Sequence, residues 1–192
     1  MDKRCEFLEK YKDNQRVKQL ILVEYLGESR AVLELWLKYG ESAWHKEFDC
    51  PACVGRSGVG RAAENDSKTP LGDFGMVCAF GIKPDPGSKL PYISVDEHTW
   101  CCGDKEQYNR IIDIRQHPHQ CSGEHMADFV PEYNYGIFFD YNVDGIPGLG
   151  FAIFLHCTGS KLYTGGCIAV DEGSMIRLVR AVDKDAKICI YK

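Results

Sequence analysis

The segment whose residue types best favour covalent chemistry is residues 150–170. An apolar run ends in His156, and a polar loop then leads to Thr164-Gly165-Gly166-Cys167. A thiol with a pKa of about 8.5 is mostly protonated at neutral pH, so a nucleophilic cysteine needs a base or a lowered pKa. His156 can be that base if a hairpin folds it back onto Cys167, which lies eleven positions later.

The residues just before the cysteine also suit acyl transfer. Gly165 and Gly166 carry no Cβ, so the backbone there can approach a substrate closely. Their N–H groups and that of Cys167 could point at a developing oxyanion. A structural role is the alternative, because cysteine is among the most buried residue types and a histidine that ends an apolar strand is often a core residue. Spacing alone leaves both interpretations open.

The elements that would position this pair are mostly strands. Residues 17–26 and 30–39 predict a hairpin around Gly27-Glu28-Ser29. In the second strand, period-two spacing puts apolar side chains on one face and Glu34 and Lys38 on the other; the apolar set is Leu33, Leu35, Leu37 and Tyr39.

Further short strands follow, separated by turn residues. They are predicted at 76–80, 111–114, 135–141, 151–155 and 188–191, and the glycine-rich stretch 54–75 is expected to be a long loop. Helices are expected only at 3–12 and at 171–182, where Asp171 can cap an apolar stripe. The pattern favours a mainly β sandwich or barrel with one short helix after the cysteine.

Bulk properties narrow the class of protein. A chain of 192 residues predicts one domain, and a net charge of −5 gives no electrostatic case for nucleic acid or anionic membrane as a partner. The first sixteen residues are rich in charge, and the first apolar run stops at Glu24, so we expect no signal peptide. No segment has the roughly 18 apolar residues of a membrane span. Ten irregularly spaced cysteines favour mostly free thiols.

At these residues the chain resembles the L,D-transpeptidase catalytic domain, the YkuD-type family of peptidoglycan enzymes. That family has a histidine closing an apolar strand, a loop, and then Ser/Thr-His-Gly-Cys, which compares with His156 and Thr164-Gly165-Gly166-Cys167 here. Upstream, other pieces match in order: Lys68-Thr69-Pro70-Leu71-Gly72, Phe80-Gly81, Pro91-Tyr92, Trp100 and Tyr108-Asn109.

The resemblance implies a single β-sandwich-like L,D-transpeptidase catalytic fold over residues 17–192, after an N-terminal extension of residues 1–16. It implies that Cys167 attacks the amide between the third and fourth residues of a peptidoglycan stem peptide and expels D-Ala. His156 would take and return the proton, and the carbonyl of Cys157 would orient its imidazole. An amine of a second stem would resolve the thioester into a 3→3 cross-link, or water would, giving carboxypeptidase activity.

Other properties follow from the same resemblance. Carbapenems should acylate Cys167, and no metal or organic cofactor is required. The substrate is expected to contact Thr164, Tyr163, His125 and Lys68. A location in the cell envelope or outside the cell is implied, although no export signal is seen. Two departures stand out: Gly165 replaces the family's histidine, and Ala169 replaces a polar residue that would help to hold the substrate's carboxylate.

Three alternatives stay open. Cys50-Pro51-Ala52-Cys53 invites a zinc or redox interpretation, and a mixed metal site could add Cys121, His117 or His119 to the adjacent pair Cys101-Cys102. The chain could also be a catalytically inactive wall-binding or zinc-stabilised scaffold. A papain-like or NlpC-like cysteine peptidase is the third, but those enzymes place the cysteine before the histidine.

Overall fold

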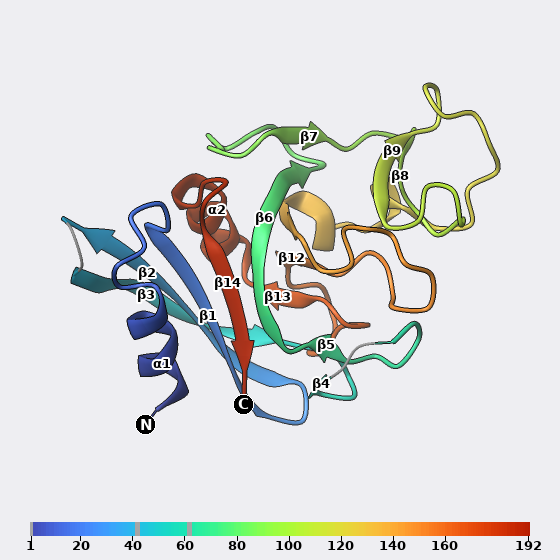
Figure 1. Cartoon of the computed structure of the whole chain (residues 1–192). Helices are drawn as coiled ribbons and strands as arrows, with labels where there is room; N and C mark the ends of the chain where they lie inside the picture. Colours follow the sequence, from blue (N-terminus) through green and yellow to red (C-terminus); the bar gives the residue numbers. More distant parts are fainter. Residues whose placement is uncertain (1, 41–42, 61–62) are drawn as a thin grey trace.

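A computed structural model of the chain describes residues 2–40, 43–60 and 63–192 (Figure 1). Strands β1 (Gln19–Gly27) and β2 (Arg30–Tyr39) form the predicted antiparallel hairpin. The turn between them is possible because Gly27 and Glu28 adopt left-handed φ angles of 108° and 58°. The sequence-based expectation of this hairpin is therefore confirmed.

Strand β3 (Ala43–Cys53) continues the meander and pairs with β2 along its whole length. The sequence analysis did not predict it. Its charged residues and Pro51 hide the strand pattern, because most of its outward side chains are exposed. The strand also bears on the metal site considered for Cys50 and Cys53. Three positions apart on an extended strand, they project to opposite faces and cannot ligate one metal ion together.

The remaining strands complete a nine-stranded sheet in the order β11-β12-β13-β3-β2-β1-β14-β6-β7. Strand β11 also pairs with β6, so the circuit of hydrogen-bonded strands is closed. The bounds of the added strands are β6 (Gly72–Gly81), β7 (Tyr92–Ser94), β11 (Gly136–Phe139), β12 (Phe154–Cys157), β13 (Ile168–Val170) and β14 (Lys187–Tyr191). The chain is mainly β, as the sequence predicts.

A second, smaller sheet lies beside the main one. It has three strands in the order β10-β8-β9, and it projects away from β1, β2 and β3 (Figure 1). Its strands are β8 (Thr99–Cys102), β9 (Arg110–Asp113) and β10 (Glu124–His125), followed by two 3₁₀ turns, η1 (Met126–Asp128) and η2 (Glu132–Asn134). Two short strands, β4 (Val59–Gly60) and β5 (Thr69–Pro70), pair within the predicted long loop.

The main core fills the inside of the strand circuit. Helix α2 (Glu172–Ala181) closes it, with Met175, Leu178 and Val179 fully buried against inward side chains of the main sheet. The helix starts where predicted, because the Asp171 side chain accepts a 2.9 Å hydrogen bond from the Ser174 N–H. A second apolar cluster, which includes Phe80, Phe154 and Cys167, lies between β6, β11 and β12 and the small sheet.

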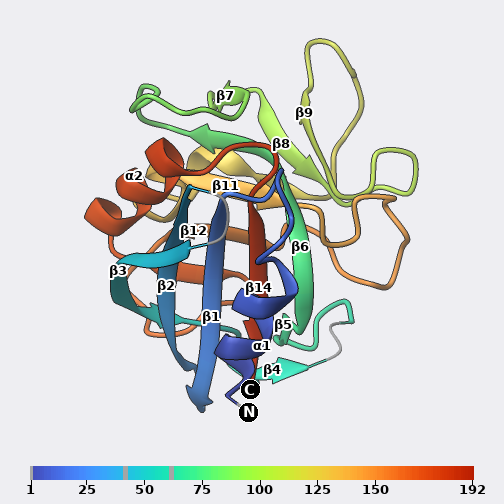
Figure 2. The same ribbon diagram turned by 60° about the vertical axis from the view of Figure 1, so that its left-hand side comes forward.

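Helix α1 (Lys3–Lys10) covers the outer face of β1 and β14 (Figure 2). The face of β2 that carries Glu34 and Lys38 is therefore not solvated, although the alternating pattern predicts a polar surface there. Lys38 is only 7% exposed, and its ammonium donates to three carbonyls, those of Tyr11, Lys12 and Asn14, at 2.5–2.9 Å. A buried ammonium is tolerable because the backbone supplies this many acceptors.

No helix within the described part of the chain is long and apolar enough to cross a membrane.

We predict that Lys38→Met lowers the free energy of unfolding by about 2 kcal/mol, because it removes charge-assisted bonds and leaves buried carbonyls without a donor. The measurement is urea denaturation of the full chain. Lys12→Gln is the matched control, since the Lys12 side chain is half-exposed and pairs with Glu9 at 3.5 Å, while the backbone carbonyl of residue 12 is retained. Equal stability of the two variants would contradict the anchoring role.

Candidate active site

The pairing of β12 with β13 brings the candidate histidine and cysteine together. The two strands run parallel, with Leu155 opposite Ile168 and His156 opposite Ala169. The prediction that a hairpin folds His156 back onto Cys167 is therefore wrong, because the two strands are parallel. The connecting loop instead crosses beside the end of β3, where Thr164 donates its N–H to the Val54 carbonyl, and this carries the chain back to start β13 in the same direction as β12.

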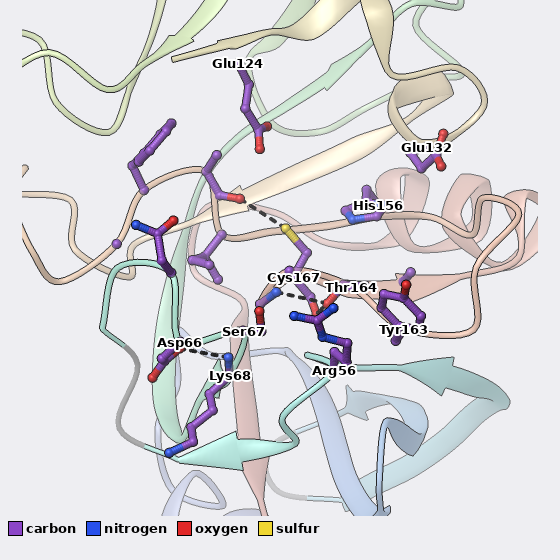
Figure 3. Close-up of a pocket in the computed structure, with 18 of the residues that line it drawn as sticks. Arg56, Asp66, Ser67, Lys68, Glu124, Glu132, His156, Tyr163, Thr164 and Cys167 are labelled. Carbon is purple, nitrogen blue, oxygen red and sulfur yellow. Dashed lines mark hydrogen bonds between the residues drawn. The ribbon is translucent and has the colours of Figure 1, made fainter. Parts of the chain in front are cut away.

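The register puts both side chains on one face of the sheet. Side chains alternate along a strand, so His156 and Phe154 share a face, and Cys167, two residues before Ala169, shares it with them. That face is turned toward the small sheet. Figure 3 shows the sulfur of Cys167 and the imidazole of His156 beneath Glu124 in one pocket. The cavity has a volume of about 560 Å³.

The Cys167 thiol is held by two backbone groups of the segment that leads into β12. It donates to the Ala152 carbonyl at 3.0 Å and accepts a hydrogen bond from the Phe154 N–H at 3.2 Å. The pKa of the thiol is raised to about 12, chiefly by burial and further by the charge of Glu124, while the Phe154 N–H acts in the opposite direction. In the resting protein the sulfur is therefore protonated at neutral pH.

The His156 imidazole is also buried, and its tautomer is set by the backbone. Nδ1 lies 2.7 Å from the Cys157 carbonyl, so Nδ1 carries the proton and Nε2 has a free lone pair. This is the contact that the resemblance implies for Cys157. Burial lowers the pKa of His156, which keeps the ring neutral at neutral pH. The edge of the Tyr133 ring packs against it, with ring centroids 5.5 Å apart.

Two threonine hydroxyls fix the main chain at the cysteine. The Cys167 carbonyl accepts hydrogen bonds from Thr164 Oγ1 at 2.6 Å and from Thr69 Oγ1 at 3.1 Å. Thr164 Oγ1 also accepts the Gly166 N–H at 3.2 Å. The Thr164 hydroxyl is thus engaged inside the protein. Thr69 was missed as a site residue, although it is the central residue of the Lys68-Thr69-Pro70 motif.

A second residue missed by the sequence analysis is Asn109. Its Oδ1 accepts the Ala152 N–H at 3.0 Å, and its amide group donates to the carbonyls of Tyr141 and Asn142. Asn109 thereby holds Ala152 in its left-handed conformation, φ 55°, which aims the carbonyl at Cys167. The left-handed residue also explains why β12 starts at Phe154 and not at the predicted residue 151.

On strand β10, Glu124 rather than His125 lines the cavity. Neighbouring side chains on a strand point to opposite faces, and His125 packs against Trp100 outside the cavity, bonded to Asp128 and the Glu97 carbonyl. Glu124 accepts a 2.5 Å hydrogen bond from the Tyr133 hydroxyl. Burial raises the pKa of the Glu124 carboxyl, whereas the Tyr133 bond lowers it.

Cationic side chains also line the same cavity. Lys68, which the sequence analysis proposed for substrate binding, is joined there by Arg56 and Lys161. Tyr163 also lines the cavity, and the Arg56 guanidinium lies 5.9 Å from the centre of its ring (Figure 3). Acidic side chains line the cavity too, namely Glu64, Asp66, Glu124 and Glu132. The positive charge available to an anionic ligand is therefore local to Arg56, Lys68 and Lys161.

No protein-family model and no curated protein matches the sequence. Among solved structures, the chain is similar to L,D-transpeptidase 1 of Mycobacterium tuberculosis, with 13% identity and a TM-score of 0.43 over 90% of this chain and 61% of that chain. An L,D-transpeptidase of Mycobacterium smegmatis gives 12% identity and a TM-score of 0.43, over 91% of this chain and 59% of that chain. The chain therefore spans about three fifths of the length of these structures. At such values a similarity assigns no activity, so the chemistry has to be argued from the side chains.

The two glycines before the cysteine give a matched test of the local backbone. Gly166 has φ 153°, and a Cβ there would lie 2.8 Å from the Ile153 side chain and 3.0 Å from the Lys68 carbonyl, whereas a Cβ at Gly165 would meet nothing within 4 Å. We predict that Gly166→Ala lowers the free energy of unfolding by about 1–3 kcal/mol and that Gly165→Ala leaves it unchanged. Urea denaturation measures both; a larger loss for Gly165→Ala would contradict this geometry.

Proposed function

We propose that the chain is a cysteine-dependent acyltransferase that acts on peptidoglycan stem peptides through a thioester on Cys167. The observation that carries the proposal is the parallel register of β12 and β13, which places His156 and Cys167 on one face at one cavity. The resemblance of the surrounding motifs to L,D-transpeptidases supplies the substrate class. The finer fold assignment, a sandwich-like L,D-transpeptidase domain over residues 17–192, belongs to the same proposal, as does a location in the cell envelope.

The reaction starts from a neutral thiol and a neutral imidazole. The thiol leaves the Ala152 carbonyl and gives its proton to Nε2 of His156 while the sulfur attacks the amide carbonyl of the donor stem. The C–S bond forms and the carbonyl oxygen becomes an oxyanion. As the tetrahedral intermediate collapses, the C–N bond breaks and the imidazolium returns the proton to the leaving D-Ala nitrogen. The Cys157 carbonyl stabilises the imidazolium formed in between.

The oxyanion needs donors that are not already engaged. The Gly166 N–H bonds to Thr164, so the N–H groups of Gly165 and Cys167 are the candidates. A Cβ at Gly165 would meet nothing within 4 Å, so the space beside this residue is open to a substrate. The thioester is then resolved by a side-chain amine of a second stem, which gives a cross-link, or by water, which gives carboxypeptidase activity. His156 takes the proton of the attacking group in either case.

The substrate's carboxylate is proposed to bind the cationic side chains of the cavity. Ala169 lines the cavity but offers only a methyl group where related domains have a polar residue. Arg56 can replace it, because a guanidinium binds a carboxylate through two parallel hydrogen bonds and the Tyr163 ring supports it from one side. Lys68 and Lys161 add charge at the same cavity.

We predict that incubation with a carbapenem adds one inhibitor mass to the wild-type chain and none to Cys167→Ala, because the strained lactam carbonyl acylates only the sulfur that shares a cavity with the His156 base. Intact-mass spectrometry is the measurement. Cys5→Ala is the matched control and must keep the adduct, since Cys5 is an exposed thiol on α1.

Release of D-Ala from a synthetic tetrapeptide stem, with and without an acceptor amine, then separates transpeptidase from carboxypeptidase activity. A wild-type chain that takes no adduct and releases no D-Ala would favour the inactive wall-binding scaffold. An adduct on Cys167→Ala would place the reactive thiol elsewhere.

We predict that the second-order rate of carbapenem acylation is flat from pH 7 to about pH 9 and falls only below about pH 6.5. The active form has a neutral His156, and a pKa below the usual value keeps that form populated as the pH falls. The thiol has a pKa of about 12 and stays protonated across this range, so thiolate formation adds no rising limb. Stopped-flow or timed mass spectrometry gives the profile. Glu124→Gln should show the same fall in rate below about pH 6.5, because that fall reports His156. A rate that climbs between pH 8 and 9 would instead show that a free thiolate attacks.

A further inference from the structure

A second group of reactive side chains lies in the small sheet, outside the cavity of Cys167. The group consists of Cys102, Asp104, His119 and Cys121, and one potential ligand atom from each lies within 4.8 Å of all the others. Cys102 ends β8, and Asp104 follows it in the next loop. His119 and Cys121 come from the loop that precedes β10. Two pairs, each with one residue between its members, thus converge on one point: Cys102 with Asp104, and His119 with Cys121.

The separations fit a tetrahedral ion. Bonds of about 2.3 Å to sulfur and 2.0–2.2 Å to nitrogen or oxygen put neighbouring ligand atoms roughly 3.3–3.8 Å apart. The sulfur of Cys102 lies 3.3 Å from Nε2 of His119 and 3.4 Å from Oδ2 of Asp104, and Nε2 lies 3.4 Å from Oδ2. These three atoms need to move by only a few tenths of an ångström to close around an ion, and the sulfur of Cys121 lies within 4.8 Å of each of them.

The surrounding groups orient these atoms as ligands. Nδ1 of His119 lies 2.7 Å from the His117 carbonyl, which leaves Nε2 unprotonated and facing the sulfurs. The N–H of Asp104 points at the sulfur of Cys102, and the N–H of Gly123 points at that of Cys121, each at 3.4 Å. Donors of this kind stabilise thiolates. Ser122 donates from both its N–H and its hydroxyl to Asp104.

We propose that Cys102, Asp104, His119 and Cys121 bind one Zn²⁺ ion as a structural site. Two thiolates, one imidazole and one carboxylate suit a borderline-soft divalent cation and exclude Mg²⁺ and Ca²⁺, which take oxygen ligands. Both thiols lose their protons on binding, so the ligand set carries a charge of −3 and the loaded site −1. The set also accounts for the mixed cysteine–histidine site that the sequence analysis left open for Cys121 and His119.

The ion would fasten the loop of residues 114–123 to the end of β8. That loop leads directly into β10, whose Glu124 lines the cavity of Cys167. Within the small sheet, β10 is held to β8 by only two residue pairs, Glu124 with Cys101 and His125 with Trp100. A clamp immediately before this short strand would therefore fix the position of Glu124. Metal binding itself is independent of the proposed acyl transfer.

The test is metal content of the full chain, purified with a phosphine reductant and without chelator. We expect about one equivalent of zinc per chain by plasma mass spectrometry, and about one equivalent of Co²⁺ with thiolate charge-transfer and tetrahedral d–d bands after exchange. Cys121→Ser and His119→Asn should lose the bound metal. Their matched controls, Cys5→Ser and His117→Asn, should keep it, because Cys5 lies on α1 and His117 contributes only its carbonyl.

Circular dichroism shows whether each variant folds. If a variant does not fold, the wild-type chain is titrated with chelator and metal instead. Chelation of the wild type should lower its melting temperature, and added Zn²⁺ should restore it, with no such response in His119→Asn. The proposal is overturned if the reduced wild type binds no Zn²⁺ or Co²⁺, if Cys121→Ser and His119→Asn retain a full equivalent, or if Cys102 and Cys121 are found joined as a disulfide. Carbapenem adduct formation is measured in a separate experiment, so the zinc site and the proposed acyl transfer can each fail without the other.

Discussion

The site depends on one piece of backbone pairing, the parallel ladder between β12 and β13. Only three residue pairs make it, yet they decide which face each side chain takes. A shift by one residue would turn either His156 or Cys167 into the main core, because side chains alternate along a strand. The loop between the strands is held from outside by hydrogen bonds to Val54 and Thr69, and from within by the Thr164 hydroxyl. Much of the structure around the cysteine therefore serves to keep this register.

Burial gives the pair its electrostatic character. A thiolate–imidazolium pair in a site this enclosed would lose the hydration of two charges, and Glu124 adds a negative charge on the side of the sulfur. Burial raises the pKa of Cys167 and lowers that of His156, and both shifts favour the neutral form of the side chain. The neutral pair is the stable resting form, and charge is expected to appear only when a bound substrate supplies a carbonyl to receive it.

The sequence predicted what depends on local pattern. The hairpin of β1 and β2 and the capped helix α2 follow from period and turn residues. Strand β3 was missed because its exposed, charged face breaks the apolar pattern. The parallel direction of β13 was missed because it is set by the path of the intervening loop.

Site residues that depend on tertiary contacts could not be read from the chain. The choice of Glu124 over His125 is decided by which face of β10 meets the cavity. Acylation of Cys167 would remove one of the two backbone hydrogen bonds of its sulfur. In an S-acylated form the sulfur has no proton, so the Ala152 carbonyl faces a sulfur lone pair without a donor between them. The Phe154 N–H can still bond to the sulfur. With one of its two backbone hydrogen bonds lost, an acylated sulfur would be held beside Ala152 less firmly than the free thiol is.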